Sequence, residues 1–318
     1  MNLLVTGGCG FIGSNFLRHI MEKYPDYEII NLDKMTYAGN PDNLKDVENN
    51  PNYSFVRGDI CDAAIVDKLM QDIDYVVHFA AESHVDRSIE DASAFVKTNV
   101  LGTFTLLDSA LKHNIKKFVH ISTDEVYGSR TEGSFKENDL LTPSSPYSSS
   151  KASSDLVAQS YYITHKLPVI ITRCTNNFGP YQYPEKLIPL FITNLLENKK
   201  VPLYGTGKNV RDWIYVLDHC KAIDFILHNG SNGEIYNIGG GAEKTNIEIT
   251  KKILNILGIN ESMIEFVKDR PGHDFRYSLD CSKLQALGWV PEYDFDNALR
   301  NTIEWYIENR WWWEKLKH

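Results

Sequence analysis

The chain has 318 residues, of which 42% are hydrophobic and 24% charged, and its formal net charge is −9 at pH 7. This composition suits a globular protein of one large or two ordinary domains, and the scattered Lys and Arg side chains argue against a nucleic acid or an anionic membrane as partner. The five cysteines lack a close pair, no apolar run approaches the roughly 18 residues of a membrane span, and the N-terminus lacks signal-peptide features, so we expect a protein of the reducing cytoplasm.

Short β-branched runs alternate with longer amphipathic stretches through the first half of the chain. The runs cover residues 2–7, 27–33, 53–59, 75–81, 116–122 and 168–173, and the amphipathic stretches cover 14–24, 62–71, 94–113 and 151–165. This alternation predicts βαβ units, so residues 1–178 are expected to form an α/β domain with a Rossmann-type doubly wound parallel sheet. After residue 178 Gly and Pro become frequent, which indicates a smaller mixed α/β domain over 179–318, with some chain exchange between the two.

The first candidate site is the opening TGGCGFIGSN, which places Gly7, Gly10 and Gly13 between a strand and a helix. Glycine is needed where the backbone must approach a pyrophosphate, whose charge then lies at the helix N-terminus. Asp33 follows at the end of the next strand, where it would bind ribose hydroxyls and repel a 2′-phosphate, so NAD is favoured over NADP. The neighbouring Lys34 tempers that preference slightly.

Further strand ends carry residues that could contact the same cofactor. Asp59 and Ile60 follow the third strand, where an adenine edge could lie, and residues 80–83 follow the fourth, near the nicotinamide side. Without more context, both sets could equally be ordinary strand-end residues.

Two adjacent carboxylates, Asp124 and Glu125, end the apolar run of FVHISTDEVYG. Two neighbouring acids repel, and burying them partly must move at least one pKa from its reference value. Adjacent residues of a regular strand point to opposite faces, so both acids can serve one ligand only if the strand has ended by Thr123. A purely structural alternative is that Asp124 caps a turn and Glu125 forms an ion pair.

Tyr147 and Lys151 follow in PYSSSKASSD, and a spacing of four places both side chains on one face of a helix. A nearby ammonium favours the phenolate, so we expect the pKa of Tyr147 to be pulled down from about 10. The pair would then act as a general base that deprotonates an alcohol, with Thr123 sharing the hydrogen bond to its oxygen. Alone, this spacing is more often solvated helix surface.

Together with Asn99 in NVLGT, these motifs resemble the extended short-chain dehydrogenase/reductase superfamily, which acts on nucleotide sugars. Over nearly the whole chain, LDKMTYAGNPDNL, HFAAESHVDRSI, STDEVYG, NNFGPYQYPEKLIP, PLYGTGKNVRDW and DRPGHDFRYSLD resemble the dTDP-glucose 4,6-dehydratase family. The resemblance implies a hydro-lyase with tightly bound NAD that is regenerated each turnover, dTDP-glucose as substrate, and a role in deoxysugar nucleotide biosynthesis such as that of dTDP-rhamnose. It also implies a homodimer formed through the helices around residues 94–113 and 151–165.

The resemblance further assigns roles at the site. Asp124 would be the acid toward the C6 hydroxyl and Glu125 the base at C5, an order that charge repulsion alone does not give. Catalysis would involve Thr123, Asp124, Glu125, Tyr147 and Lys151. The cofactor would contact Gly7, Gly10, Phe11, Ile12, Gly13, Asp33, Lys34, Thr36, Asp59, Ile60, Ala80, Ala81, Ser83, Thr98, Tyr147, Lys151 and Asn177. The substrate would contact Ser83, His84, Thr123, Asn176, Lys186, Leu187, Pro202, Tyr204, Arg211, Asn246, Arg270, His273 and Tyr277.

Asp124 is the discriminating residue among the alternatives. Related epimerases usually carry small or hydroxyl residues where the two acids stand, and related decarboxylases and other dehydratases often keep the glutamate alone. A non-catalytic dinucleotide-binding sensor would have no use for the acids and the Tyr–Lys pair together. The histidines show no metal-ligand spacing, so no metal is expected. The segment between Tyr127 and Tyr147 is shorter than is usual in the family, so the resemblance does not predict whether this loop closes over the site.

Overall fold

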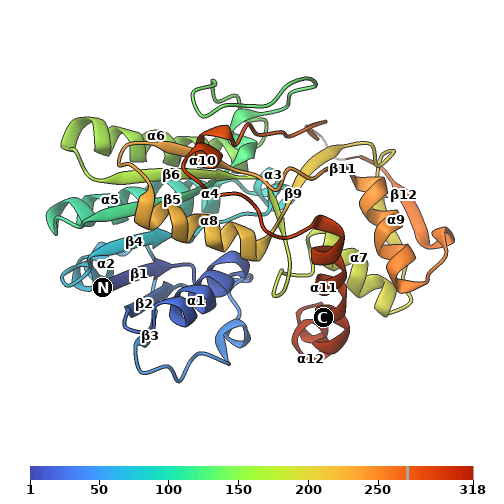
Figure 1. Ribbon diagram of the computed structural model, residues 1–318, viewed down its shortest axis with the longest axis horizontal. Coiled ribbons are helices and arrows are strands. Elements are labelled where there is room, and N and C mark those ends of the chain that lie inside the picture. The colour runs from blue at the N-terminus through green and yellow to red at the C-terminus, as the bar shows by residue number, and fades with distance from the viewer. Residues whose placement is uncertain (270–271, 318) are drawn as a thin grey trace.

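The structure is a computed structural model that describes residues 1–269 and 272–317 (Figure 1). Its largest element is a seven-stranded parallel sheet with the strand order β10-β6-β5-β4-β1-β2-β3. This is the Rossmann order with one strand added, which confirms the predicted fold class. The strands are β1 (Asn2–Thr6), β2 (Glu28–Asp33), β3 (Tyr53–Arg57), β4 (Tyr75–His78), β5 (Lys117–Thr123), β6 (Val169–Cys174) and β10 (Ile235–Ile238).

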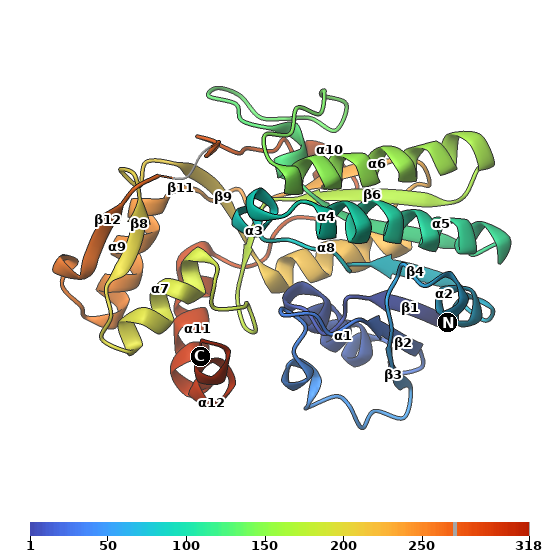
Figure 2. The same ribbon diagram turned by 180° about the vertical axis from the view of Figure 1, so that it is seen from behind.

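Helices cover both faces of this sheet, as Figures 1 and 2 show from opposite sides. One face packs against α1 (Phe11–Lys23) and α8 (Val216–Asn229), and the other against α2 (Ala63–Met70), α5 (Thr103–Lys112) and α6 (Pro146–His165). Successive side chains of a strand point to opposite faces, so Leu3 and Val5 join the first apolar core and Leu4 joins the second. Both faces are therefore buried, and the strands read as continuous apolar runs.

The predicted helix over residues 94–113 is interrupted in the structure. It begins with α4 (Ser93–Phe95), continues as a π-helix over Val96–Gly102, and becomes regular in α5, while α3 (Val85–Glu90) precedes it. The buried Asn99 of the π-helix accepts from the backbone N–H of Glu82 at 2.8 Å and donates to its carbonyl at 3.0 Å. The π-helical segment thus fixes the chain that leaves β4 beside the predicted cofactor residues.

The chain after residue 178 builds a smaller lobe, but it also returns to the large sheet. Together with β7 (Asn176–Phe178), which ends at residue 178, its strands β9 (Val210–Tyr215) and β11 (Glu243–Thr245) form a three-stranded sheet, and β8 (Val201–Tyr204) pairs with β12 (Ile264–Val267). Its helices are α7 (Leu187–Leu196), α9 (Asn246–Leu257), α11 (Phe295–Glu308) and α12 (Arg310–Trp313), whereas α10 (Ser282–Ala286) adds Leu284 to the core of the large sheet. Strand β10 and helix α8 leave this lobe to complete the Rossmann sheet and its helical cover.

The core of the smaller lobe contains the end of the described chain. Trp312 and Trp313 are buried among α7, α9 and α11, whereas Trp311 is half exposed. The indole of Trp312 donates to Asn43 at 2.7 Å, in the 3₁₀ helix Pro41–Leu44, and so links this lobe to the Rossmann domain. Across residues 1–269 and 272–317, no helix combines the length and apolar character needed to cross a membrane.

Candidate active site

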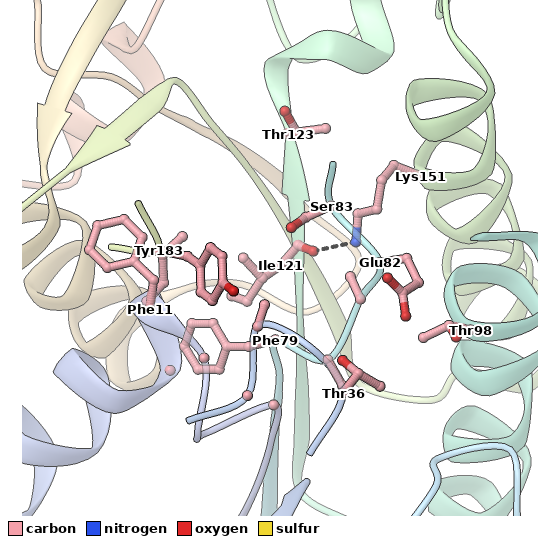
Figure 3. Close-up of a pocket in the computed structure, with 18 of the residues that line it drawn as sticks. Phe11, Thr36, Phe79, Glu82, Ser83, Thr98, Ile121, Thr123, Lys151 and Tyr183 are labelled. Carbon is pink, nitrogen blue, oxygen red and sulfur yellow. Dashed lines mark hydrogen bonds between the residues drawn. The ribbon is translucent and has the colours of Figure 1, made fainter. Parts of the chain in front are cut away.

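A cavity of about 320 Å³ opens at the carboxyl ends of the parallel strands. Strand β1 pairs with β2 on one side and with β4 on the other, so the strand order reverses at β1. Open α/β sheets bind their ligands at this topological switch point. Figure 3 shows the cavity between the glycine loop, the exits of β4 and β5, and helix α6.

The glycine loop packs so closely against its surroundings that side chains are excluded. Gly7 has a φ of +75°, and a Cβ there would lie 2.6 Å from the backbone nitrogen of Ala80. A Cβ on Gly13 would lie 2.4 Å from the carbonyl oxygen of Gly7. The first turn of α1 is thereby held against the loop with its N-terminus open to the cavity, which is the cradle that a pyrophosphate requires.

Asp33 lies at the end of β2 and is nearly fully buried. Its carboxylate accepts hydrogen bonds from the backbone N–H groups of Cys9 at 2.9 Å and Met35 at 2.8 Å. Burial raises its pKa, and the two N–H donors oppose that shift. Each carboxylate oxygen keeps a lone pair for a ribose hydroxyl. Lys34 is paired with Asp59 at 2.8 Å, so its ammonium is partly neutralised and gives little support to a 2′-phosphate.

Tyr147 and Lys151 both lie on α6, which starts at Pro146. A capping box between Ser145 and Ser148 fixes the start of this helix. Burial lowers the pKa of Lys151 to about 8, and its ammonium donates to the carbonyl of Ile121 at 2.7 Å (Figure 3). The two side chains therefore share one helix face inside the cavity, as their spacing predicted.

The expected lowering of the Tyr147 pKa is not seen in the protein alone. Burial raises the pKa of Tyr147 well above its usual value, and the charge of Glu125 adds to that shift. A hydrogen bond with Thr123 opposes it. The prediction was wrong for the protein alone because burial and the charges of Glu125 and Asp124 raise the pKa, while the Lys151 ammonium is directed at the Ile121 carbonyl.

The two acids begin a new element. Strand β5 ends at Thr123 and a 3₁₀ helix spans Asp124–Tyr127, which confirms that the strand has ended before the acids. The Thr123 hydroxyl donates to Asp124 Oδ1 at 3.1 Å and accepts from the backbone N–H of Glu125 at 3.3 Å. Burial, followed by the charge of Glu125, raises the pKa of Asp124 well above its usual range. Asp124 is therefore suited to donate a proton at neutral pH.

The cavity gathers most of the residues that the sequence indicated. All five predicted catalytic residues and every predicted cofactor residue line it, together with four from the substrate set. These four are Ser83, Thr123, Asn176 and Lys186. The ammonium of Lys186 donates to the Ser83 carbonyl at 3.0 Å.

The remaining described substrate candidates do not line this cavity, and Arg270 lies outside the described residues. Arg211 is buried, donates to the carbonyl of Asp274 at 2.9 Å, and lies 4.2 Å from the ring centre of Tyr277. Its charge lowers the pKa of Asp124, so this group borders the acids from the smaller lobe. The other members outside the cavity lining are His84, Leu187, Pro202, Tyr204, Asn246 and His273.

Several lining residues were not singled out in the sequence, Tyr183 and Glu185 among them. Glu185 accepts from the Tyr37 hydroxyl at 3.1 Å and lies 3.5 Å from the guanidinium of Arg87. The signal that could have found Glu185 is its position beside the predicted Lys186 in YPEKLIP.

The short segment between Tyr127 and Tyr147 is attached to the smaller lobe. Phe135 donates through its N–H to Ser278 at 2.9 Å and accepts from the N–H of Asp280 at 2.8 Å. Arg276 donates to the carbonyl of Gly133 at 2.7 Å. These bonds hold the segment beside the residues that precede α10.

Comparison with known proteins adds independent findings. Residues 4–302 match the family described as GDP-mannose 4,6 dehydratase. A dTDP-glucose 4,6-dehydratase of Streptomyces antibioticus is 54% identical over 323 residues, which cover 100% of this chain and 96% of the relative. The crystal structure of a dTDP-glucose 4,6-dehydratase from Streptomyces venezuelae with NAD bound has a TM-score of 0.98 and 54% identity, covering 99% of this chain and 100% of that one. A UDP-glucuronic acid 4-epimerase from Bacillus cereus, in complex with UDP-glucuronic acid and NAD, has a TM-score of 0.92 and 30% identity, with coverage of 97% and 99%.

Proposed function

Because the chain belongs to the GDP-mannose 4,6-dehydratase family, we infer that it is an NAD-dependent dTDP-glucose 4,6-dehydratase, a hydro-lyase. It converts dTDP-glucose to dTDP-4-keto-6-deoxyglucose and water, a step of deoxysugar nucleotide biosynthesis such as that leading to dTDP-rhamnose. The observation that carries this conclusion is the placement of Asp124 and Glu125 in one cavity with Tyr147 and the glycine cradle.

The chain's own residues supply the proton transfers. We propose that Tyr147 removes the proton of the C4 hydroxyl, while the Lys151 ammonium favours the phenolate and Thr123 holds the oxygen. Bound NAD would accept the C4 hydride and return it to C6, and its positive nicotinamide would oppose the effect of burial on the pKa of Tyr147. The cradle, with Asp33 at the ribose position, fits this cofactor.

The two acids carry out the elimination. Once C4 is a ketone the C5 proton becomes acidic, and Glu125 can remove it. The neutral carboxyl of Asp124 gives its proton to the C6 hydroxyl, which leaves as water. The carboxyl of Glu125 then exchanges its proton with solvent and delivers a solvent-derived proton to C5 as C6 receives the hydride. The raised pKa of Asp124 supports this division, because the acid has to be protonated when the base is not.

The smaller lobe is proposed to hold the sugar nucleotide. Arg211 and Tyr277 border the two acids from that lobe, and Lys186 and Asn176 reach the shared cavity. A guanidinium suits a diphosphate, although Arg211 would have to exchange a carbonyl partner for a phosphate oxygen.

The epimerase remains the nearest alternative, since the Bacillus cereus enzyme shares the fold at 30% identity. An epimerase needs oxidation and reduction at C4 but no acid–base pair for losing water. Asp124 and Glu125 therefore favour the dehydratase, and a non-catalytic sensor would use neither acid.

A homodimer is proposed from an apolar surface on α5, α6 and the π-helix. Five apolar side chains of this surface are about half exposed or more: Val96, Leu101, Phe104, Leu156 and Ile163. A monomer would leave this apolar surface in contact with water, which is unfavourable. A Leu156→Glu variant should elute as a monomer where the wild type elutes as a dimer. Leu140→Glu, an equally charged change at an exposed loop residue, should still elute as a dimer.

We also propose a cytoplasmic location, which the five free cysteines support.

The test of the function is incubation of the purified protein with dTDP-glucose, without added cofactor, in ordinary and deuterated water. Mass spectrometry should show loss of one water and one solvent deuterium at C5. An unchanged mass with added NAD would overturn the proposal. Conversion of UDP-glucose but not of dTDP-glucose would show that the substrate is the uridine nucleotide.

A further inference from the structure

At the end of the proposed reaction, the protonation states of Tyr147 and Asp124 differ from those at its start. Tyr147 gains the proton of the C4 hydroxyl, and Asp124 loses its proton to the departing water. Glu125 takes a proton from C5 and later delivers one to C5, so its own proton count is unchanged. After each turnover Tyr147 must therefore lose one proton and Asp124 must gain one before the next substrate can react, whatever the order of the chemical steps.

The Thr123 hydroxyl lies between these two groups. It donates to Asp124 Oδ1 at 3.1 Å, and its interaction with the Tyr147 hydroxyl opposes the rise that burial causes in the pKa of that phenol. A hydroxyl has one proton to donate and two lone pairs. One lone pair of Thr123 accepts from the backbone N–H of Glu125, so while the hydroxyl donates to Asp124 the other lone pair is left for a proton from Tyr147. Thr123, Asp124 and Tyr147 are all at most 9% exposed, which restricts exchange of protons with bulk solvent.

The two oxygens of Asp124 are differently placed. Oδ1 faces the Thr123 hydroxyl, whereas Oδ2 is buried with no hydrogen-bond partner among the described residues. The carboxyl can thus receive a proton at Oδ1 and present an oxygen to a ligand at Oδ2.

We propose that the Thr123 hydroxyl relays a proton from Tyr147 to Asp124 at the end of each turnover and so resets the enzyme; this rests on the proposed dehydratase function. The Tyr147 O–H bond breaks as a bond to Thr123 Oγ1 forms, and the original Thr123 O–H bond breaks as a bond to Asp124 Oδ1 forms. No electrons are exchanged with a cofactor, and the hydroxyl regains its proton count. The high pKa of Asp124 makes it the favoured end of the relay, with a bound nicotinamide cation lowering the pKa of Tyr147 at the other end.

The relay predicts a specific kinetic pattern in a Thr123→Val variant, because the first turnover needs no reset. Rapid-quench mixing of the NAD-containing variant with excess dTDP-glucose should give a first turnover of about one product per active site, slowed only by the lost hydrogen bond to the C4 oxygen, followed by turnover at least about ten times slower again. Thr123→Ser, which keeps the hydroxyl, should restore a linear time course. The matched control is Thr172→Val, the same change at a buried threonine on the neighbouring strand β6, and it should show no burst.

The outcomes separate the relay from other roles of Thr123. Equal slowing of the first and later turnovers would mean that Thr123 only positions the substrate oxygen, and the relay would be refuted. A linear time course at the wild-type rate would refute it as well. Thr123→Ala gives the same test if valine at this position prevents folding, and imidazole, a mobile proton carrier, should raise its slow rate but not its burst. A wild type that makes no product would overturn the proposed function itself.

Discussion

Replacement of Asp124 by asparagine tests the assignment of the general acid. Asparagine keeps the shape of the side chain but has no acidic proton to transfer. General acid catalysis contributes about 10²–10⁴-fold in rate, or about 3–5 kcal/mol of the barrier, so overall dehydration should fall by that factor. Oxidation at C4 depends on Tyr147 and Lys151, and it should continue and accumulate reduced cofactor on the enzyme.

The same variant has an unusual expected effect on stability. The pKa of Asp124 is raised in the folded protein, so the stabilisation from this group is full below about pH 4 and is lost as the pH rises through the folded value. Asparagine does not titrate. The variant should therefore be more stable than the wild type at neutral pH, and this gain should shrink as the pH falls toward 4.

Stopped-flow absorbance of reduced nicotinamide, mass spectrometry of the product and thermal melts at several pH values would measure these effects. Near wild-type dehydration by the Asp124→Asn variant would refute the assignment of the acid. A melting temperature that falls below that of the wild type at neutral pH would refute the claim that Asp124 is held neutral.

Three further predictions follow from the structure. In Glu125→Gln, C4 oxidation should persist, whereas solvent deuterium should no longer enter at C5; retention of deuterium incorporation would remove Glu125 from the mechanism. Gly13→Ala places a Cβ 2.4 Å from the Gly7 carbonyl oxygen and should abolish NAD retention during purification, whereas Gly258→Ala, in open space at the end of α9, should keep the cofactor. Asp224, whose pKa is lowered by hydrogen bonds from His19, His228 and Lys23, should stabilise the fold at neutral pH and lose that effect as the pH falls below about 4. Thermal melts of Asp224→Asn should thus lie below those of the wild type at pH 7 and converge with them in acid, and a constant difference would contradict this reasoning.

Most strands of the large sheet were predictable because they are apolar runs buried on both faces, and the exposed edge strand β3 was predictable from its β-branched and aromatic residues. The interruption of the helix over 94–113 was not, since a π-helix differs from an α-helix by a shift of backbone hydrogen bonds and leaves no change in apolar spacing. The sequence likewise did not predict that β10 returns to the edge of the large sheet. Residues 235–238 were not predicted as a strand, and their position after residue 178 gives no sign that they pair with β6.

The cofactor side of the site was predictable for a topological reason. Parallel strands bring their carboxyl ends to one edge, so residues such as Asp33, Ala80 and Thr123 had to meet there. The lobe that faces them has no such rule, and Pro202 and His273 lie outside the cavity lining. The direction of the Tyr147 pKa shift was also beyond the sequence, because it depends on how completely the neighbouring layers bury the phenol.

Burial shifts three groups of this site toward their neutral forms, and the reaction requires that arrangement. It raises the pKa of Asp124 and of Tyr147 and lowers that of Lys151 to about 8. A fully charged site would keep Asp124 ionised and unable to donate, whereas a fully neutral one would leave Tyr147 unable to accept. Both requirements are met if the positive charge that favours the Tyr147 phenolate is that of the bound cofactor. Asp124, which accepts the hydrogen bond of Thr123, then stays protonated. Tight retention of NAD is then a requirement of the acid–base chemistry as well as of hydride transfer.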